Sequence, residues 1–132
     1  MQKNLITKDV SKLVTGLNYA QKVERAHELI RTAYKEYGDQ LVVANSLGKD
    51  SVAVWHLAKK VELKIRGFIV TTRYKPPETV KFMNEQVAKY PELKVFYNDA
   101  QIPDKLYLTN PDRCCDILKV EPTRQAIEQM NV

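Results

Sequence analysis

Residues 40 to 51 read Gln-Leu-Val-Val-Ala-Asn-Ser-Leu-Gly-Lys-Asp-Ser, and their pattern predicts the class of fold. Its first part, residues 40–44, is a short apolar run rich in β-branched side chains, which is typical of a buried strand. Residues 45–49 then form a turn, and residues 50–61 have the length and apolar spacing of a helix. A buried strand that leads through a glycine-containing turn into a helix indicates the first unit of a parallel α/β sheet.

The same alternation continues along the chain in both directions. Before the first strand, apolar residues keep helical spacing over residues 17–38, and the final glycine is well suited to end a helix. After it, apolar runs at residues 65–71 and 93–97 predict two further strands, separated by a proline-started helix over residues 76–90. Strands that alternate with helices predict right-handed β–α–β units, and hence a three-layer α/β fold around a parallel sheet.

The C-terminal part of the chain has a less regular pattern. Residues 98–113 are polar and contain two prolines, which predicts a loop over a site or a mobile flap. Residues 120–130 predict a last helix, again started by a proline. The two cysteines, Cys114 and Cys115, are therefore expected just before this helix.

Composition limits the class of protein. The chain has 132 residues, 44% of them hydrophobic and 28% charged, which predicts one folded domain over residues 1–132. No apolar run is long enough for a membrane span, and the start of the chain lacks the apolar core of a secretory signal. The two cysteines are neighbours rather than a spaced disulfide framework. We therefore expect a cytoplasmic protein with no membrane partner.

The net charge of +5 is concentrated between residues 59 and 75, which hold six basic residues and one acid. Such charge can serve a phosphate-bearing ligand or a nucleic acid. Basic and aromatic residues do not alternate as they do in nucleic-acid-binding surfaces, so we expect no nucleic-acid partner. We expect the part from Lys59 to Arg66 to be solvated surface.

The turn after the first strand is the candidate ligand site, because open parallel sheets bind ligands beyond the carboxyl ends of their strands. Gly48 would let backbone N–H groups approach a phosphate or sulfate, Ser46 and Ser51 would add hydroxyl donors, and Lys49 would add charge. Asp50 is expected to cap the helix or to order the loop. The turn is not a Walker A loop, since it lacks that motif's first glycine and the Ser or Thr after its lysine. A serine-capped turn without a ligand is the alternative.

Three segments carry a family resemblance. Ser46-Leu-Gly-Lys-Asp-Ser51 resembles the S-G-G-x-D-S loop of the PP-loop superfamily, with Leu47 in place of one glycine. Arg113-Cys-Cys-Asp-Ile-Leu-Lys-Val-Glu-Pro-Thr-Arg-Gln-Ala-Ile127 closely resembles the C-C-x-x-x-K-V-E-P-x-x-x-A segment of phosphoadenylylsulfate and adenylylsulfate reductases. Thr72-Arg-Tyr-Lys-Pro-Pro-Glu-Thr79, with the residue before it, looks like the D-T-G-x-x-x-P-E-T segment of the same family. Since the three motifs occur in the family's order, the resemblance runs from about Asn18 to the end.

The resemblance implies an adenine nucleotide alpha hydrolase-like, Rossmann-like fold that binds an adenylylated sulfate or another adenine nucleotide. It also implies an oxidoreductase of sulfate assimilation, in which a cysteine attacks the substrate's sulfur to give a thiosulfonate and then sulfite, with a thioredoxin-like electron donor. On the matched positions, the resemblance implies that the phosphosulfate is held by Ser46, Gly48, Lys49, Asp50 and Ser51. Thr71 and Thr72 would lie near the nucleoside, and Lys119 would face the anionic site.

The chain also departs from the family pattern. It is C-terminally short, without the family's C-x-x-C pair or its C-terminal nucleophilic cysteine. By the resemblance, Cys114 and Cys115 would supply half of the thiolates of a [4Fe-4S] cluster, so a complete cluster would need a second chain or a partner. On physical grounds a structural thiol or a redox nucleophile stays open, because nearby basic residues favour a thiolate. Thr71 and Arg73 replace the family's aspartate and glycine, which affects the expected nucleoside contacts.

Three functions remain open from the sequence. The first is a reductase-family domain that is completed by a partner or by a missing segment. The second is a different PP-loop chemistry, an ATP pyrophosphatase or sulfurtransferase that depends on ATP and magnesium. The third is a non-catalytic module that binds an adenine nucleotide. A short sheet with a bare edge would also be consistent with a homo-oligomer or a partner subunit.

Overall fold

The fold is described from a computed structural model, which describes residues 15–131. The expectation about a leader at the start of the chain lies outside these residues. In chain order the elements are α2 (Tyr19–Tyr37), the 3₁₀ turn η1 (Gly38–Gln40), β1 (Val42–Ala44), α3 (Lys49–Val61), β2 (Arg66–Thr72), α4 (Pro77–Lys89), β3 (Leu93–Asn98), α5 (Leu106–Thr109), α6 (Pro111–Cys115), the π-helical segment η2 (Asp116–Val120) and α7 (Glu121–Gln129).

The three strands form one parallel sheet in the order β1-β2-β3. Val42 lies opposite Arg66 in the first pair, and Gly67 lies opposite Leu93 in the second. Since neighbouring strands in the sheet are also neighbours in the chain, α3 and α4 each serve as a crossover connection. The predicted three strands and the parallel sheet are confirmed.

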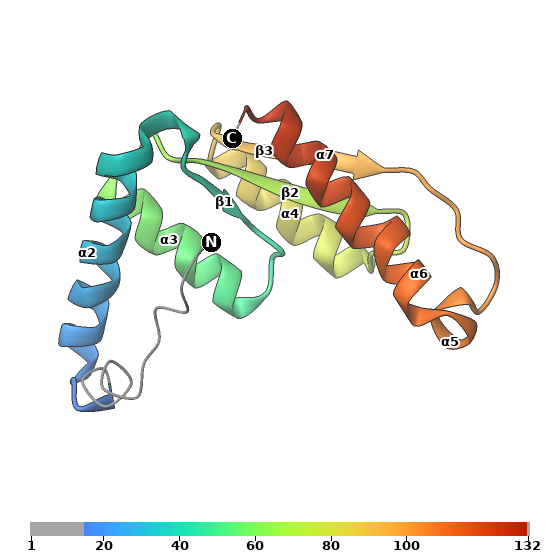
Figure 1. Ribbon diagram of the computed structural model, residues 1–132, viewed down its shortest axis with the longest axis horizontal. Coiled ribbons are helices and arrows are strands. Elements are labelled where there is room, and N and C mark those ends of the chain that lie inside the picture. The colour runs from blue at the N-terminus through green and yellow to red at the C-terminus, as the bar shows by residue number, and fades with distance from the viewer. Residues whose placement is uncertain (1–14, 132) are drawn as a thin grey trace.

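Helices cover both faces of the sheet, and each face has its own apolar cluster. On one face, Trp55 of α3 packs with Ile69 and Leu93 of the sheet, and α4 adds partly buried side chains to this cluster. On the other face, Phe68 of β2 packs with Ala126 of α7. Figure 1 shows α7 across one face, with α3 and α4 on the opposite side. The predicted three-layer α/β architecture is therefore confirmed.

Local signals explain the boundaries of α2. Asn18 and Gln21 form a capping box, in which each side chain accepts a hydrogen bond from the other residue's backbone N–H at 2.9 Å. The helix ends at Gly38, whose φ of +56° lies in the left-handed region that favours glycine. The helix packs against α3 at the end of the sheet nearest β1 (Figure 1).

The expectation that Lys59 to Arg66 is solvated surface is wrong at both of its ends. Lys59 is only 6% exposed, and its Nζ donates to the backbone oxygen of Ile65 at 3.1 Å and to Glu92 Oε2 at 3.1 Å. Arg66 is half-buried and donates to the backbone oxygens of Asp39 and Met130. A long basic side chain can bury its stem and still place its charge against carbonyl oxygens, which a charge count along the sequence does not reveal.

The prediction for the C-terminal region is also wrong in part. Residues 98–113, expected to be a loop or flap, contain α5 and most of α6, and the last helix begins at Pro111 rather than near residue 120. Asn110 caps α6 by accepting a hydrogen bond from the N–H of Arg113, and Pro111 occupies the first turn. A second proline, Pro122, then lies inside a continuous helical run that passes through η2.

Within residues 15–131, no helix is both long enough and apolar enough to cross a membrane.

Candidate functional site

A cavity of about 410 Å³ opens at the carboxyl ends of β1 and β2, on the face of the sheet that α7 covers. The two strands end at Ala44 and Thr72, and both residues line it. This is the edge at which open parallel sheets bind ligands. The complete lining consists of Ala44, Asn45, Ser46, Phe68, Val70, Thr72, Tyr74, Lys75, Leu118, Lys119 and Thr123.

The turn between β1 and α3 forms one wall of the cavity. The N–H of Asn45 donates to the backbone oxygen of Phe68 at 2.9 Å, which fixes the turn to β2. Asn45 Oδ1 in turn accepts from the N–H of Leu47 at 2.9 Å. Leu47 has a φ of +67°, a left-handed conformation that costs a non-glycine residue roughly 1–2 kcal/mol. Its side chain packs against the cluster around Trp55, and this apolar contact offsets the strain.

The start of α3 presents backbone donors beside this turn. Gly48 is the N-cap residue, and no side chain makes a capping hydrogen bond there. The first N–H groups of a helix have no partner within the helix, so without a side-chain cap they are available to an anion. Ser46 and Ser51, whose Oγ atoms lie 2.8 Å apart, bring two hydroxyl groups to the same place.

The two charged residues in the first turn of α3, Lys49 and Asp50, do not face the cavity as anion ligands would. Lys49 is 93% exposed and does not line the cavity. Its Nζ lies 3.7 Å from Oδ1 of Asp50. Asp50 therefore makes no capping hydrogen bond, in contrast to the expectation that it caps the helix.

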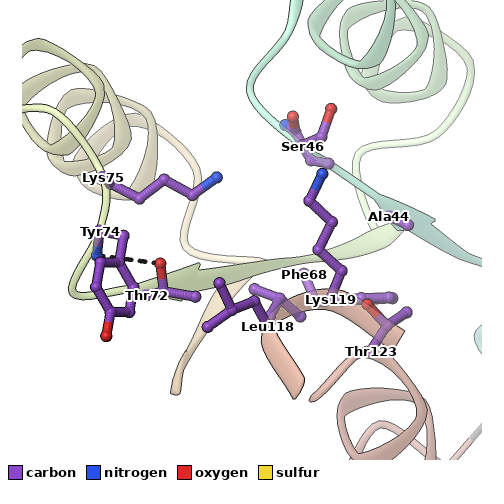
Figure 2. A pocket seen from close by; sticks show the side chains of 11 residues that line it. Ala44, Ser46, Phe68, Thr72, Tyr74, Lys75, Leu118, Lys119 and Thr123 are labelled. Atoms are coloured by element: carbon purple, nitrogen blue, oxygen red, sulfur yellow. Dashed lines mark hydrogen bonds between the residues drawn. The ribbon is translucent and has the colours of Figure 1, made fainter. Parts of the chain in front are cut away.

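Two lysines supply positive charge to the cavity, and none of its described lining residues is acidic. Lys119 comes from η2, and Lys75 comes from the turn after β2. Figure 2 shows that both side chains point into the open space beside Ser46, from opposite sides. Neither amine has a hydrogen-bond or ion-pair partner among the residues that the structure describes. The cavity is thus electrostatically suited to an anion.

The floor of the cavity is apolar. Phe68 and Val70 of β2 and Leu118 of η2 provide it, and Figure 2 shows Phe68 and Leu118 between the two lysines. An apolar surface with a few polar groups at its margin is the usual composition of a small-molecule site, and a flat aromatic base packs well on it.

Asn45 is a site feature that sequence reasoning missed. The residue is 2% exposed, and its buried Nδ2 atom has no hydrogen-bond partner among the described residues. An unpaired buried donor costs about 1–3 kcal/mol, so it marks a place where a partner is missing. In the sequence, asparagine in a turn reads only as a turn former, which gave no reason to single it out.

The structure brings some of the predicted site residues together and separates others. Ser46, Thr72 and Lys119 all line the cavity, although they are far apart in the sequence. Gly48 and Ser51 lie beside it, at the start of α3, as described above. Thr71 does not line it: side chains alternate along a strand, so Thr71 and Thr72 face opposite sides of the sheet.

Three further lining residues, Tyr74, Lys75 and Thr123, were not predicted. The N–H of Tyr74 donates to Thr72 Oγ1 at 3.2 Å, and its hydroxyl accepts from the N–H of Ile102 at 3.0 Å. Tyr74 and Lys75 occupy variable positions of the segment that includes Thr72, and Thr123 occupies a variable position of the segment that includes the two cysteines. Their position next to residues that match the family motifs is the signal in the sequence that could have identified them as part of the site.

The cysteine pair lies inside α6, so the expectation that it precedes a helix is wrong. Cys114 is half-buried, Cys115 is exposed, and the two are free thiols. The N–H of Cys114 donates to the backbone oxygen of Asn110 at 3.1 Å. Neither cysteine lines the cavity. The described residues contain no group of three or more His, Cys, Asp or Glu side chains that could hold a metal ion.

The parallel α/β architecture, with a cavity where the strands end, defines a Rossmann-like fold. Residues 40–132 match the family model described as the phosphoadenosine phosphosulfate reductase domain, and the chain belongs to this family. The family that the sequence motifs indicated is therefore confirmed.

Individual relatives agree with this assignment. The chain is 30% identical over 108 residues to a phosphoadenosine 5′-phosphosulfate reductase of Gloeobacter violaceus, covering 75% of this chain and 45% of the relative. It is 33% identical over 111 residues to an adenosine 5′-phosphosulfate reductase of Bacillus pumilus, covering 77% and 48%. The chain thus spans about half the length of the curated relatives it matches.

A solved structure shares the fold. It is a phosphoadenylyl-sulfate reductase from Candida auris, described as a phosphate complex. The two structures superpose with a TM-score of 0.67 at 17% sequence identity, over 88% of this chain and 65% of that one. At this identity the likeness supports the fold alone.

Proposed function

We propose that this domain binds an adenylylated sulfate in the cavity at the ends of β1 and β2. The observation that carries the proposal is the pair of unpartnered lysines, Lys75 and Lys119, above an apolar floor. An adenylylated sulfate has a flat base for such a floor and an anionic phosphosulfate for such cations. Membership of the reductase family supports the same ligand class.

In this arrangement the phosphosulfate lies against the β1–α3 turn. Ser46, Ser51 and the backbone N–H groups after Gly48 donate hydrogen bonds to it, and Lys119 faces it from the opposite wall. Lys49 contributes charge only from the rim, because it is exposed and lies beside Asp50. The nucleoside lies over Phe68 and Leu118, with Thr72 at its margin and Thr71 limited to backbone contacts.

The chemistry that we propose for the completed protein is reduction of the bound sulfate group to sulfite. A thiolate attacks the sulfur, an S–S bond forms, and the bond from sulfur to the bridging phosphate oxygen breaks, so that the adenosine phosphate leaves. A second thiol then displaces sulfite from the thiosulfonate and leaves a disulfide, which a thioredoxin-like donor reduces with two electrons. Lys119 and the start of α3 stabilise the negative charge that develops on the leaving phosphate.

The attacking thiol comes from outside the described residues in this proposal. Cys114 and Cys115 do not line the cavity and therefore are not placed for attack on a ligand there. A partner subunit, a second copy of the chain or a further segment would supply it.

The proposal is tested by thermal unfolding of the reduced protein with adenylylsulfate, phosphoadenylylsulfate, AMP or ATP with magnesium. A ligand at a hundred times its Kd adds roughly 2.7 kcal/mol, which raises the midpoint by several degrees. We expect a shift with the phosphosulfate nucleotides, which Lys119→Met removes. Lys81→Met is the matched control, because Lys81 is exposed on α4 and outside the cavity. A shift with ATP and magnesium alone would instead favour the pyrophosphatase or sulfurtransferase function.

A second candidate function is a non-catalytic module that binds an adenine nucleotide. The observation that favours it is the position of both free thiols outside the cavity. Incubation with a phosphosulfate nucleotide and dithiothreitol or reduced thioredoxin separates the two candidates. Sulfite release would support the reductase, whereas binding without sulfite release would support the module.

We also propose that Cys114 and Cys115 act as half of the ligand set of a [4Fe-4S] cluster, as the resemblance implies. Such a cluster takes four thiolates, and the described residues provide two, so this part of the chain alone does not fit a complete cluster. The rest of the set would come from another chain or segment. Iron content and visible absorption after anaerobic reconstitution test this: both are expected to fall with Cys114→Ser, and no iron uptake by the unaltered protein would contradict it.

A further inference from the structure

Leu47 departs from the pattern of the loop to which it belongs. The S-G-G-x-D-S loop that residues 46–51 resemble has a glycine at this position. Leu47 nevertheless has a left-handed backbone conformation, with a φ of +67°. Glycine adopts this conformation freely, whereas the Cβ atom of any other residue opposes it. Contacts with the rest of the protein must therefore hold Leu47 in place.

Asn45 supplies one of these contacts. Its Oδ1 atom accepts a hydrogen bond from the N–H of Leu47 at 2.9 Å. Such a bond, from an asparagine side chain to the backbone two residues later, closes a turn in the same way as a backbone carbonyl does. It fixes the direction of the Leu47 N–H and so restrains the backbone at Leu47.

Asn45 is itself held by the sheet. The residue is only 2% exposed, and its own N–H donates to the backbone oxygen of Phe68 at 2.9 Å. The side chain of Leu47 packs against the cluster around Trp55. Leu47 is thus fixed at two points, at its backbone by Asn45 and at its side chain by the core.

The conformation of Leu47 sets where the hydrogen-bond donors beside it lie. Leu47 follows Ser46, whose Oγ atom lies 2.8 Å from that of Ser51, and it precedes Gly48, the N-cap residue of α3. Rotation about φ of Leu47 would move Ser46 relative to the start of α3. The two hydroxyl groups and the unpaired N–H groups of the helix would then no longer face the same place.

Asn45 also belongs to the cavity that this turn borders. It is one of the lining residues, and its buried Nδ2 atom has no hydrogen-bond partner among the described residues. Lys75 and Lys119 point into the same space (Figure 2). The contact between Asn45 and Leu47 therefore lies in the wall of a cavity with several unpaired donors.

We infer that Asn45 is a positioning residue, which takes the place of the loop glycine by holding Leu47 in the left-handed conformation and so keeps the β1–α3 turn ready for an anionic ligand group. The inference rests on the proposed nucleotide site. It predicts that Asn45 is needed when residue 47 is leucine. When residue 47 is glycine, Asn45 becomes dispensable, because no Cβ atom opposes the conformation.

The test is a double-mutant cycle, measured by isothermal titration calorimetry of the reduced full-length chain with adenylylsulfate. Asn45→Ala is expected to weaken binding about fivefold when Leu47 is present, which corresponds to the loss of one hydrogen bond. In a Leu47→Gly background the same substitution is expected to change the affinity by less than about twofold.

Thermal unfolding without ligand separates this role from a purely structural one. Leu47→Gly removes the apolar contact with the cluster around Trp55, so it is expected to lower the midpoint while the affinity stays within about twofold. Asn18→Ala is the matched control. Asn18 Oδ1 also accepts from a backbone N–H at 2.9 Å, at the start of α2 and outside the cavity, so its loss is expected to lower the midpoint and to leave the affinity unchanged.

Three other results would overturn the inference in ways that can be told apart. An equal loss of affinity from Asn45→Ala in both backgrounds would assign Asn45 to direct contact with the ligand. A lower midpoint with unchanged affinity in Asn45→Ala would show a structural role alone. Absence of binding of adenylylsulfate, phosphoadenylylsulfate and AMP by the unaltered protein would refute the nucleotide site itself, and with it this inference.

Discussion

Gly67 is the glycine for which the structure leaves no room. A Cβ atom at this position in β2 would lie 2.6 Å from Cζ3 of Trp55 and 3.1 Å from Cδ1 of Leu93. Both neighbours are buried in the core of the sheet. At Gly48, in contrast, a Cβ would meet only Ser46 Oγ at 3.6 Å, which is an ordinary contact. Packing thus requires glycine at position 67, whereas position 48 has room for a side chain.

Gly67→Ala is expected to lower the free energy of unfolding by about 1–3 kcal/mol, because it over-packs the cluster around Trp55. Gly48→Ala is the matched control and is expected to cost less than about 1 kcal/mol without ligand. Chemical denaturation followed by circular dichroism measures both. Equal losses would contradict the packing explanation.

Glu92 couples stability to pH through its contact with Lys59. A hydrogen bond with its own backbone and the hydrogen bond from Lys59 hold the pKa of Glu92 below its ordinary value. Because the folded-state pKa lies below the unfolded-state value, the carboxylate stabilises the fold above the unfolded-state pKa. This contribution is lost as the pH falls through the folded-state pKa.

We therefore expect the thermal midpoint to fall more steeply below about pH 4.5 in the unaltered protein than in Glu92→Gln. The measurement is thermal unfolding by circular dichroism over a series of acidic buffers. Parallel curves for the two proteins would show that Glu92 does not contribute. Glu85→Gln is a suitable control, because Glu85 is an exposed carboxylate on α4.

At the scale of elements, the helical run from α6 through α7 shapes both the core and the site. Its π-helical segment η2 adds a residue to the turn, a feature found often at functional sites. η2 carries Leu118 and Lys119 into the cavity, and Asn98 of β3 donates to the backbone oxygen of Ile117 at 2.9 Å. About two turns later, Ala126 is completely buried against Phe68. The position of Lys119 thus depends on how closely α7 packs on the sheet.

Ala126→Leu is expected to cost about 1–3 kcal/mol of stability, because the added carbons displace α7 from β2. The same displacement moves Lys119, so nucleotide binding is expected to weaken as well. Ala88→Leu on the exposed side of α4 controls for the larger side chain. Denaturation and calorimetry report the two effects; unchanged stability would contradict the packing assignment.

At the scale of the whole molecule, the core is unevenly distributed. The fully buried apolar side chains belong to the sheet, to α3, to α7 and to the connections beside them, among the described residues. The 19-residue helix α2 contains no buried residue and lies against α3 at one end of the molecule (Figure 1). The two faces of the sheet therefore hold most of the stability, and α2 adds little to it.

Hydrogen exchange is expected to follow this division. Backbone amides of α2 are expected to exchange faster than those of α3 and β2, because α2 contains no buried residue of its own, whereas α3 and β2 contain several. Mass spectrometry of peptides from the three elements measures the difference. Protection of α2 equal to that of β2 would mean that it unfolds only with the core.

Local patterns in the sequence predict the class of fold and most of its elements. Apolar periodicity, glycine stops and proline starts are local signals, and they placed the three strands and the helices between them to within a few residues. Motif order also identified the family. Three residues named from these motifs, Ser46, Thr72 and Lys119, lie together at one cavity, because parallel strands end at the same edge of a sheet.

Packing between distant parts of the chain sets which other residues line that cavity and which face away from it. Lys75 and Asn45 belong to the lining, whereas Thr71 faces the other side of the sheet, a difference set by strand alternation and turn geometry. Lys59 is buried because Glu92 and nearby carbonyl oxygens meet it from elsewhere in the chain. These placements depend on contacts between residues distant in sequence, which local pattern does not encode.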